Sequence, residues 1–416
     1  MTEDRHLQET MTELDKKTGL YIHFPFCVRK CNYCAFLSFS ADEGVRREYA
    51  GALMREIELA GRSFSGQIST IYLGGGTPSV MDVSLLSLII KKVRQCFDVA
   101  PDAEITNEAN PGTLGIKDRV VRAKLTAYKY MGINRLSMGV QSMDNDRLHM
   151  LGRIHTAENV VRDFDIAREL GFDNINLDLI FSVPGESTED ALDDAKKIIA
   201  LGPEHISCYS LQLEEGTPFY EMAERGEITE VADEEDRGTY HRICGLLRSS
   251  GYEHYEISNF AREGRRSRHN SLYWNMDDYI GLGLGASGFT RGVRYRNTSD
   301  LSTYLAYYGG QDADGAEWTT ERPLDEIHEN TDFDNISEAV FTGLRRTEGI
   351  TYEEALAAYG MSPQKDAAEQ FWKIFRDAED EAKRFADQGL LIIDDAGLRL
   401  TEEGIDISNS IMSLFV

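Results

Sequence analysis

Residues 19–36 read GLYIHFPFCVRKCNYCAF, a short apolar strand that runs directly into a loop with three cysteines. The spacing is Cys27-x3-Cys31-x2-Cys34, a clustering typical of a metal site. One interpretation is a zinc site with His23 as the fourth ligand. The other is a [4Fe-4S] cluster whose fourth iron has no protein ligand. No second Cys/His pair lies at zinc-finger spacing, which favours the cluster.

The alternation of short apolar runs with helical patterns continues from this strand to about residue 213. Six runs are typical of strands: 19–24, 69–73, 104–108, 134–140, 174–181 and 205–213. The residues suited to chemistry follow one strand after another, at Cys27, Gly74–Pro78, Glu108, Gln141, Asp178 and Gln212. Functional groups at successive strand ends are typical of a barrel rather than of an open sheet. The sequence therefore predicts an α/β fold built on a partial (β/α)6 TIM-type barrel.

The rest of the chain follows a different pattern, which divides it into four regions. We expect an N-terminal tail over 1–18, the barrel over 19–250, a linking region over 251–335 that is glycine- and aromatic-rich over 251–291, and a C-terminal module over 336–416. Residues 310–335 are acidic and are predicted to form a loop. The last region reads as helices followed by the hairpin LLIIDDAGLRLT, which is typical of a winged-helix-like α+β module. Its charges are mixed in sign, so we expect it to pack or to bind a partner rather than DNA.

Composition limits the classes of partner. The formal net charge is −27, from 71 acidic and 44 basic residues, which disfavours nucleic acid. The first 19 residues have no apolar signal segment, and no run of about 18 apolar residues could span a bilayer. These features predict a cytoplasmic protein. Cys96, Cys208 and Cys244 lie in helix or strand patterns and are expected in the core.

The second predicted strand runs into Gly74-Gly75-Gly76-Thr77-Pro78, where glycine lets a ligand approach the backbone closely. Together with the cysteine loop, this run resembles the radical SAM branch that contains oxygen-independent coproporphyrinogen III oxidase and the HemW-type heme chaperones. The resemblance covers roughly residues 18–415. It implies a [4Fe-4S] cluster on Cys27, Cys31 and Cys34, with S-adenosylmethionine (SAM) bound at the open iron.

By the same resemblance, a set of residues is expected to contact SAM or to line its cavity: Tyr21, Tyr33, Gly75, Gly76, Thr77, Glu108, Gln141, Arg153 and Asp178. For Gln141 and Arg153 a capping or surface-pairing role is an alternative. Glu108 and Asp178 stand at the ends of apolar strands, where a buried carboxylate needs a partner. A ribose hydroxyl or an ammonium group would serve.

Two positions separate the chaperone from the oxidase. The oxidase pattern has a fourth cysteine where this chain has Phe36. His269-Asn270-x2-Tyr273-Trp274 matches the HNxxYW motif that HemW-type proteins associate with heme. Imidazole is a common axial ligand of heme iron, although a histidine beside aromatics is also typical of a core or loop residue.

An arginine cluster and one serine near this motif also bear on the choice between chaperone and oxidase. Arg262, Arg265, Arg266 and Arg268 form a basic cluster that could pair with two propionates. Ser287 stands where the family pattern has a histidine.

The sequence thus favours a radical SAM heme chaperone, with heme near His269 and with apo-hemoproteins as acceptors. A coproporphyrinogen III oxidase and a zinc-stabilised binding module are the alternatives, so whether the chain is an enzyme stays open. A homodimer is left open as well.

Overall fold

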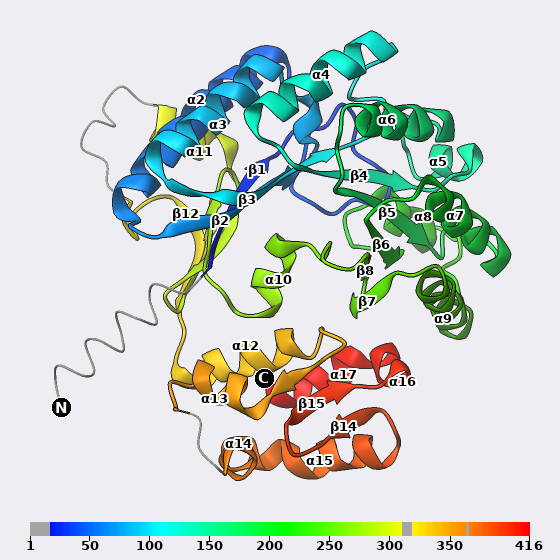
Figure 1. Ribbon diagram of the computed structural model, residues 1–416, viewed down its shortest axis with the longest axis vertical. Helices are drawn as coiled ribbons and strands as arrows, with labels where there is room; N and C mark the ends of the chain where they lie inside the picture. The colour runs from blue at the N-terminus through cyan, green and yellow to red at the C-terminus, as the bar shows by residue number, and fades with distance from the viewer. Residues whose placement is uncertain (1–16, 310–317, 363–365) are drawn as a thin grey trace.

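The computed structural model describes residues 17–309, 318–362 and 366–416, so nearly all of the predicted tail over 1–18 lies outside the described residues. Its centre is a curved sheet in which six parallel strands follow one another in chain order, as the sequence predicts (Figure 1). These strands are β1 (Thr18–Phe24), β2 (Gln67–Gly75), β3 (Asp98–Ala109), β4 (Arg135–Gln141), β5 (Ile175–Phe181) and β6 (His205–Ser210). The predicted partial barrel is confirmed.

Helices cover the outer face of these strands (Figure 1). They are α2 (Glu43–Ser63), α3 (Val83–Cys96), α4 (Asp118–Met131), α6 (Ala157–Glu169), α7 (Thr188–Leu201) and α9 (Asp233–Ser249). The short helices α5 (Asn145–Met150) and α8 (Pro218–Glu224) instead contact the cysteine loop through Asn32. Helix α3 buries Leu86, Ile90 and Val93, whose spacing of four and three residues places them on one face of the helix. Left-handed glycines follow α4 and α7 at Gly132 and Gly202, and they let each helix end and the chain turn into the next strand.

The sheet extends beyond the six strands at both edges. At one edge β9 (Tyr279–Leu282) pairs in parallel with β1, and β10 (Ser287–Thr290), β11 (Val293–Asn297) and β12 (Leu324–Glu329) continue it antiparallel. At the other edge, β8 (Asn259–Ala261) pairs with β6, and β7 (Glu253–Glu256) pairs with β8. The predicted loop over 310–335 is therefore wrong where it is described, because it includes β12 and the start of a helix. Helix α11 (Leu301–Gly309) precedes this segment.

The C-terminal module lies below the barrel, with the short helix α10 (Arg268–Trp274) between them (Figure 1). Its helices are α12 (Asp332–Gly343), α13 (Tyr352–Ala358), α14 (Ala367–Ile374), α15 (Arg376–Asp387), α16 (Glu402–Asp406) and α17 (Ser408–Met412). Strands β14 (Leu391–Ile393) and β15 (Gly397–Leu400) form the predicted hairpin, and β13 (Ile350–Thr351) pairs with β15. Helix α12 begins four residues before the predicted boundary at 336. Across the described ranges, no helix has both the length and the apolar composition to cross a membrane.

Candidate functional site

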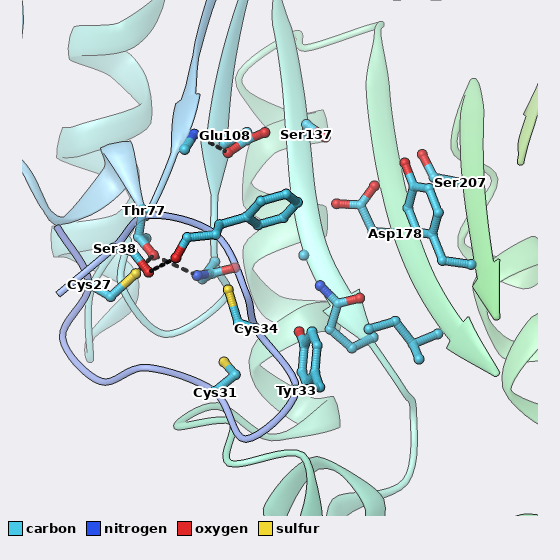
Figure 2. A pocket seen from close by; sticks show the side chains of 18 of the residues that line it. Cys27, Cys31, Tyr33, Cys34, Ser38, Thr77, Glu108, Ser137, Asp178 and Ser207 are labelled. Atoms are coloured by element: carbon cyan, nitrogen blue, oxygen red, sulfur yellow. Dashed lines mark hydrogen bonds between the residues drawn. The ribbon is translucent and has the colours of Figure 1, made fainter. Parts of the chain in front are cut away.

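A cavity of about 400 Å³ opens at the carboxyl ends of the parallel strands (Figure 2). The cysteine loop after β1 forms one wall, and residues from β2 to β6 form the others. Most predicted cluster and SAM residues line it: Cys27, Cys31, Tyr33, Cys34, Gly75, Gly76, Thr77, Glu108, Gln141, Arg153 and Asp178. The barrel therefore brings together residues that are up to about 150 positions apart in the sequence.

Backbone hydrogen bonds hold the cysteine loop at the mouth of the cavity. Cys27 N–H donates to Phe39 O at 3.0 Å, and Asn32 N–H donates to Leu151 O at 3.0 Å. All three thiols are half-buried, and Arg153 Nη1 donates to Cys31 Sγ at 3.3 Å. A buried guanidinium beside a thiolate stabilises negative charge there.

The three thiols line the same cavity. Throughout the described part of the chain, no three His, Cys, Asp or Glu side chains are grouped so that they could hold one metal ion. A four-iron cluster binds each cysteine sulfur to a different iron, so it needs the thiols spread around it rather than converging on one point.

His23, the proposed fourth zinc ligand, is turned away from the cysteines. Its Nδ1 lies 2.9 Å from Tyr21 Oη, and its Nε2 lies 3.0 Å from Leu37 O. Its side chain does not line the cavity. Both ring nitrogens are thus occupied within the fold, and the geometry does not support a Cys3His zinc site.

The glycine run is required by close packing as well as by ligand approach. Gly75 has φ +108°, and a Cβ at this position would lie 2.5 Å from the His23 ring. A Cβ on Gly76 would lie 2.9 Å from backbone atoms of Phe24 and Phe26. The run therefore lies flat against the loop after β1 and exposes its other side to the cavity.

Two half-buried carboxyl groups, those of Glu108 and Asp178, line the cavity (Figure 2). Glu108 accepts hydrogen bonds from Tyr72 Oη at 2.8 Å and from Gly75 N–H at 3.1 Å. Burial, with a contribution from Asp178, raises the pKa of Glu108 to about 7. Burial also raises the pKa of Asp178, although Asn176 donates to Asp178 Oδ1 at 2.7 Å. A cationic ligand would stabilise both ionised carboxylates.

Gln141 and Arg153 belong to the polar wall of the cavity. Gln141 has φ +72°, a conformation uncommon for a non-glycine residue, and its buried Oε1 has no hydrogen-bond partner among the described residues. Arg153 Nη2 donates to Asn110 Oδ1 and to Gly139 O, each at 2.6 Å. An orphaned acceptor and a strained backbone in a cavity mark a place for a ligand.

Tyr21 does not line the cavity, unlike the other predicted SAM residues. Its hydroxyl bonds His23, and its ring stacks with that of Tyr72 at 6.3 Å between centroids. The structure places it behind Tyr72, where it supports the wall rather than forming it.

Of the four predicted heme residues, only Asn270 lines the cavity. His269 is fully buried, with Nδ1 2.7 Å from Thr70 Oγ1 and Nε2 2.8 Å from Tyr273 Oη. Burial lowers its pKa to about 3, so the ring is neutral. The Trp274 ring lies 4.6 Å from the guanidinium of Arg345 in the C-terminal module. In this conformation His269 offers no free nitrogen to an iron.

The four arginines near this motif do not form a free basic patch. Arg262 donates to Ser250 O at 2.7 Å, Arg265 pairs with Asp173 at 3.1 Å, Arg266 pairs with Glu253 at 2.6 Å, and Arg268 pairs with Asp102 at 3.6 Å. The three ion pairs are partly exposed and weak, so they could exchange for another anion. Ser287 begins β10 and is exposed.

Several lining residues were missed by the sequence analysis: Tyr72, Asn110, Arg135, Ser137, Asn176, Ser207 and Tyr209. Most lie within the predicted strands. Their polar side chains in otherwise apolar strands could have identified them as candidates for the site. Arg135 is the clearest example, because its long charged side chain is only 2% exposed.

Comparison with known proteins agrees with this geometry. The profile of the Radical SAM superfamily matches residues 21–198, and that of the HemN C-terminal domain matches residues 331–407. Heme chaperone HemW of Bacillus subtilis is 31% identical over 95% of this chain and 98% of its own length. The chain belongs to the HemW family of radical SAM proteins.

Other relatives of this HemW-family chain are similarly distant. Heme chaperone HemW of Lactococcus lactis is 32% identical over 97% of the chain and 98% of its own length. The mitochondrial radical S-adenosyl methionine domain-containing protein 1 of Danio rerio is 31% identical over 95% of the chain and 86% of its own length. The structure of coproporphyrinogen III oxidase (HemN) from Escherichia coli superimposes with a TM-score of 0.79 over 99% of this chain and 93% of its own, at 23% identity, which shows the same fold.

Proposed function

We propose that this protein is a cytoplasmic heme chaperone that carries a [4Fe-4S] cluster, binds SAM, and passes heme to apo-hemoproteins. The observation that carries the cluster and SAM assignments is the cavity, which is lined by three cysteines, a glycine run and two half-buried carboxyl groups. The heme assignment rests on the likeness to HemW chaperones over nearly the whole chain.

Each wall of the cavity has a separate role in this proposal. Cys27, Cys31 and Cys34 hold three irons, and Arg153 stabilises the negative charge at Cys31. Such a cluster, when reduced, supplies the electron that cleaves SAM. The backbone of Gly75 and Gly76 lets SAM approach closely, while Glu108 and Asp178 attract its positive charge. Tyr33, Gln141 and Thr77 complete the polar lining.

The heme segment is proposed to be α10, through His269, Asn270, Tyr273 and Trp274. Because His269 bonds Thr70 and Tyr273, an axial bond to iron requires its release from the barrel. Trp274 is partly exposed and lies against Arg345 of the C-terminal module, whereas the Tyr273 ring packs on Tyr279 of β9 at 4.6 Å between centroids. The flat faces of both rings suit a porphyrin.

Anaerobic reconstitution followed by heme titration tests the proposal. We expect close to four irons and four sulfides per chain, and a Soret band that the His269→Ala variant loses. Tyr273→Phe, which frees one imidazole nitrogen, should keep the band and strengthen heme binding. Zinc in place of iron would contradict the cluster assignment. Turnover of coproporphyrinogen III would instead support the oxidase, and size-exclusion chromatography with and without heme tests the homodimer.

A further inference from the structure

A continuous series of contacts joins helix α10 to the carboxyl group of Glu108. The His269 imidazole stacks on the Tyr72 ring, with 5.2 Å between centroids and 26° between planes. Tyr72 donates its hydroxyl hydrogen to Glu108 Oε1 at 2.8 Å, and Glu108 Oε2 accepts from Gly75 N–H at 3.1 Å. Both oxygens of this carboxyl group therefore have fixed partners, one of which stacks on His269.

His269 is itself held rigidly. Its two ring nitrogens bond the hydroxyls of Thr70 on β2 and Tyr273 on α10. A hydroxyl can donate or accept, so either tautomer of the neutral ring is fully satisfied. The N–H groups of Arg268 and His269, at the start of α10, both donate to the buried carboxylate of Glu104 on β3.

We propose that His269 is a positioning residue of the SAM cavity, which acts through Tyr72 to orient the carboxyl group of Glu108. This inference rests on the proposed function, because it takes SAM as the ligand of the cavity. It gives the buried histidine of the HNxxYW segment a role that does not involve a bond to heme iron.

The alternative is that His269 only fills the core. A filler would affect stability and leave the geometry of Glu108 unchanged, since Tyr72 has a second stacking neighbour in Tyr21. A positioning residue must alter ligand affinity beyond its effect on stability, and it must do so through Tyr72. A double-mutant cycle separates the two roles.

The experiment measures SAM affinity by equilibrium dialysis of the cluster-loaded protein without heme, together with the change in the EPR spectrum of the reduced cluster when SAM is added. We expect His269→Ala and Tyr72→Phe each to weaken SAM binding about tenfold, which corresponds to about 1.4 kcal/mol. The variant that carries both substitutions should bind SAM no more weakly than the single variant with the lower SAM affinity.

His254→Ala is the matched control. His254 is a half-buried histidine that stacks on Phe260 at 4.3 Å between centroids, outside the cavity. We expect this variant to lose stability and to bind SAM within about twofold of the wild type. If His269→Ala does not fold, Thr70→Val and Tyr72→Phe carry the test, because each removes one hydroxyl and keeps most of the packing.

Two outcomes would overturn the inference alone. In the first, His269→Ala and Tyr72→Phe both bind SAM within twofold of the wild type. In the second, the fold-decrease in SAM affinity of the double variant equals the product of the two single decreases. A wild-type protein that binds no SAM would instead contradict the proposed function of the cavity.

Discussion

Gly75 combines a left-handed backbone with a contact that no side chain could occupy. A Cβ there would lie within 2.8 Å of three atoms of the His23 ring, whereas Gly171 has φ +81° and open space around it. We expect Gly171→Ala to cost about 1 kcal/mol from backbone strain alone. Gly75→Ala should cost several times more and should weaken SAM binding. Urea denaturation of both variants checks this, and equal losses would contradict the packing argument.

We expect Glu108 to make the affinity for SAM depend on pH. Its pKa is raised to about 7, so in the free protein it becomes protonated as the pH falls through 7. A cationic ligand needs the ionised form, so we expect affinity to fall by up to about tenfold per pH unit below 7 and to level off above it. Isothermal titration with SAM from pH 5.5 to 8.5 measures this slope, and Glu108→Gln should reduce it.

Glu56 supplies the control for that titration. It is fully buried on α2, and burial raises its pKa to about 7 as well, but its partners are Tyr304, Asn297 and Gly283 N–H, away from the cavity. Glu56→Gln should leave the pH dependence of SAM binding unchanged. A flattened slope in this variant would show that the dependence is not a property of the cavity.

At single residues, the sequence predicted those site positions that lie at or just beyond the end of a strand. Cys27, Gly75 and Glu108 were found in this way, because parallel strands end at one edge of the sheet. His269 was not predicted to be buried, since its partner Thr70 is 199 positions away. Pairing over that distance depends on where α10 docks, and a local pattern does not encode this.

At the scale of elements, the first turn of helix α10 is held by the carboxylate of Glu104, which lies on strand β3. Glu104 accepts from the N–H groups of Arg268 and His269 at 3.3 and 3.2 Å. Glu104→Ala would leave these groups without their acceptor, which costs about 1–3 kcal/mol. We expect faster hydrogen exchange over 265–275 and weaker SAM binding. In contrast, Glu354→Ala, which removes a side chain that caps α13, should speed exchange only in that helix.

Elements with strong periodicity were predicted from sequence, while others depended on neighbours. Strands β1 to β6 carry apolar runs that are buried on both faces, and their sequences alone identify them. Strand β12 is mostly exposed and reads LDEIHE, so its pairing with β11 gives it a structure that its acidic sequence does not suggest. Strands β10 and β11, which also extend the sheet past β9, were missed as well.

At the scale of the whole molecule, an ion pair between a half-buried arginine and a buried glutamate joins the barrel sheet to the C-terminal module. The side chain of Glu256 on β7 is fully buried, and Arg345, just after α12, lies 3.8 Å from it. Arg345→Met would leave this carboxylate unpaired at a cost of about 3 kcal/mol.

We expect the loss of stability in Arg345→Met to depend on pH, because the carboxyl group of Glu256 can take up a proton. Burial raises the pKa of Glu256, and removal of Arg345 raises it further. The carboxyl group can then protonate in acid, so we expect the loss of stability to be larger at pH 8 than at pH 5.5. Denaturant unfolding at both values tests this. Arg384→Met breaks an exposed pair with Glu381 and should change stability by less than about 0.5 kcal/mol.

The single imidazole at position 269 cannot stack on Tyr72 and ligate an iron at the same time. If heme iron binds this imidazole, heme binding lowers the affinity of the protein for SAM. SAM binding must then lower the affinity for heme by the same factor. Titrations of heme with and without saturating SAM, and of SAM with and without heme, should therefore give equal ratios. The protein would then release SAM as it captures its cargo, which sets an order of events for delivery.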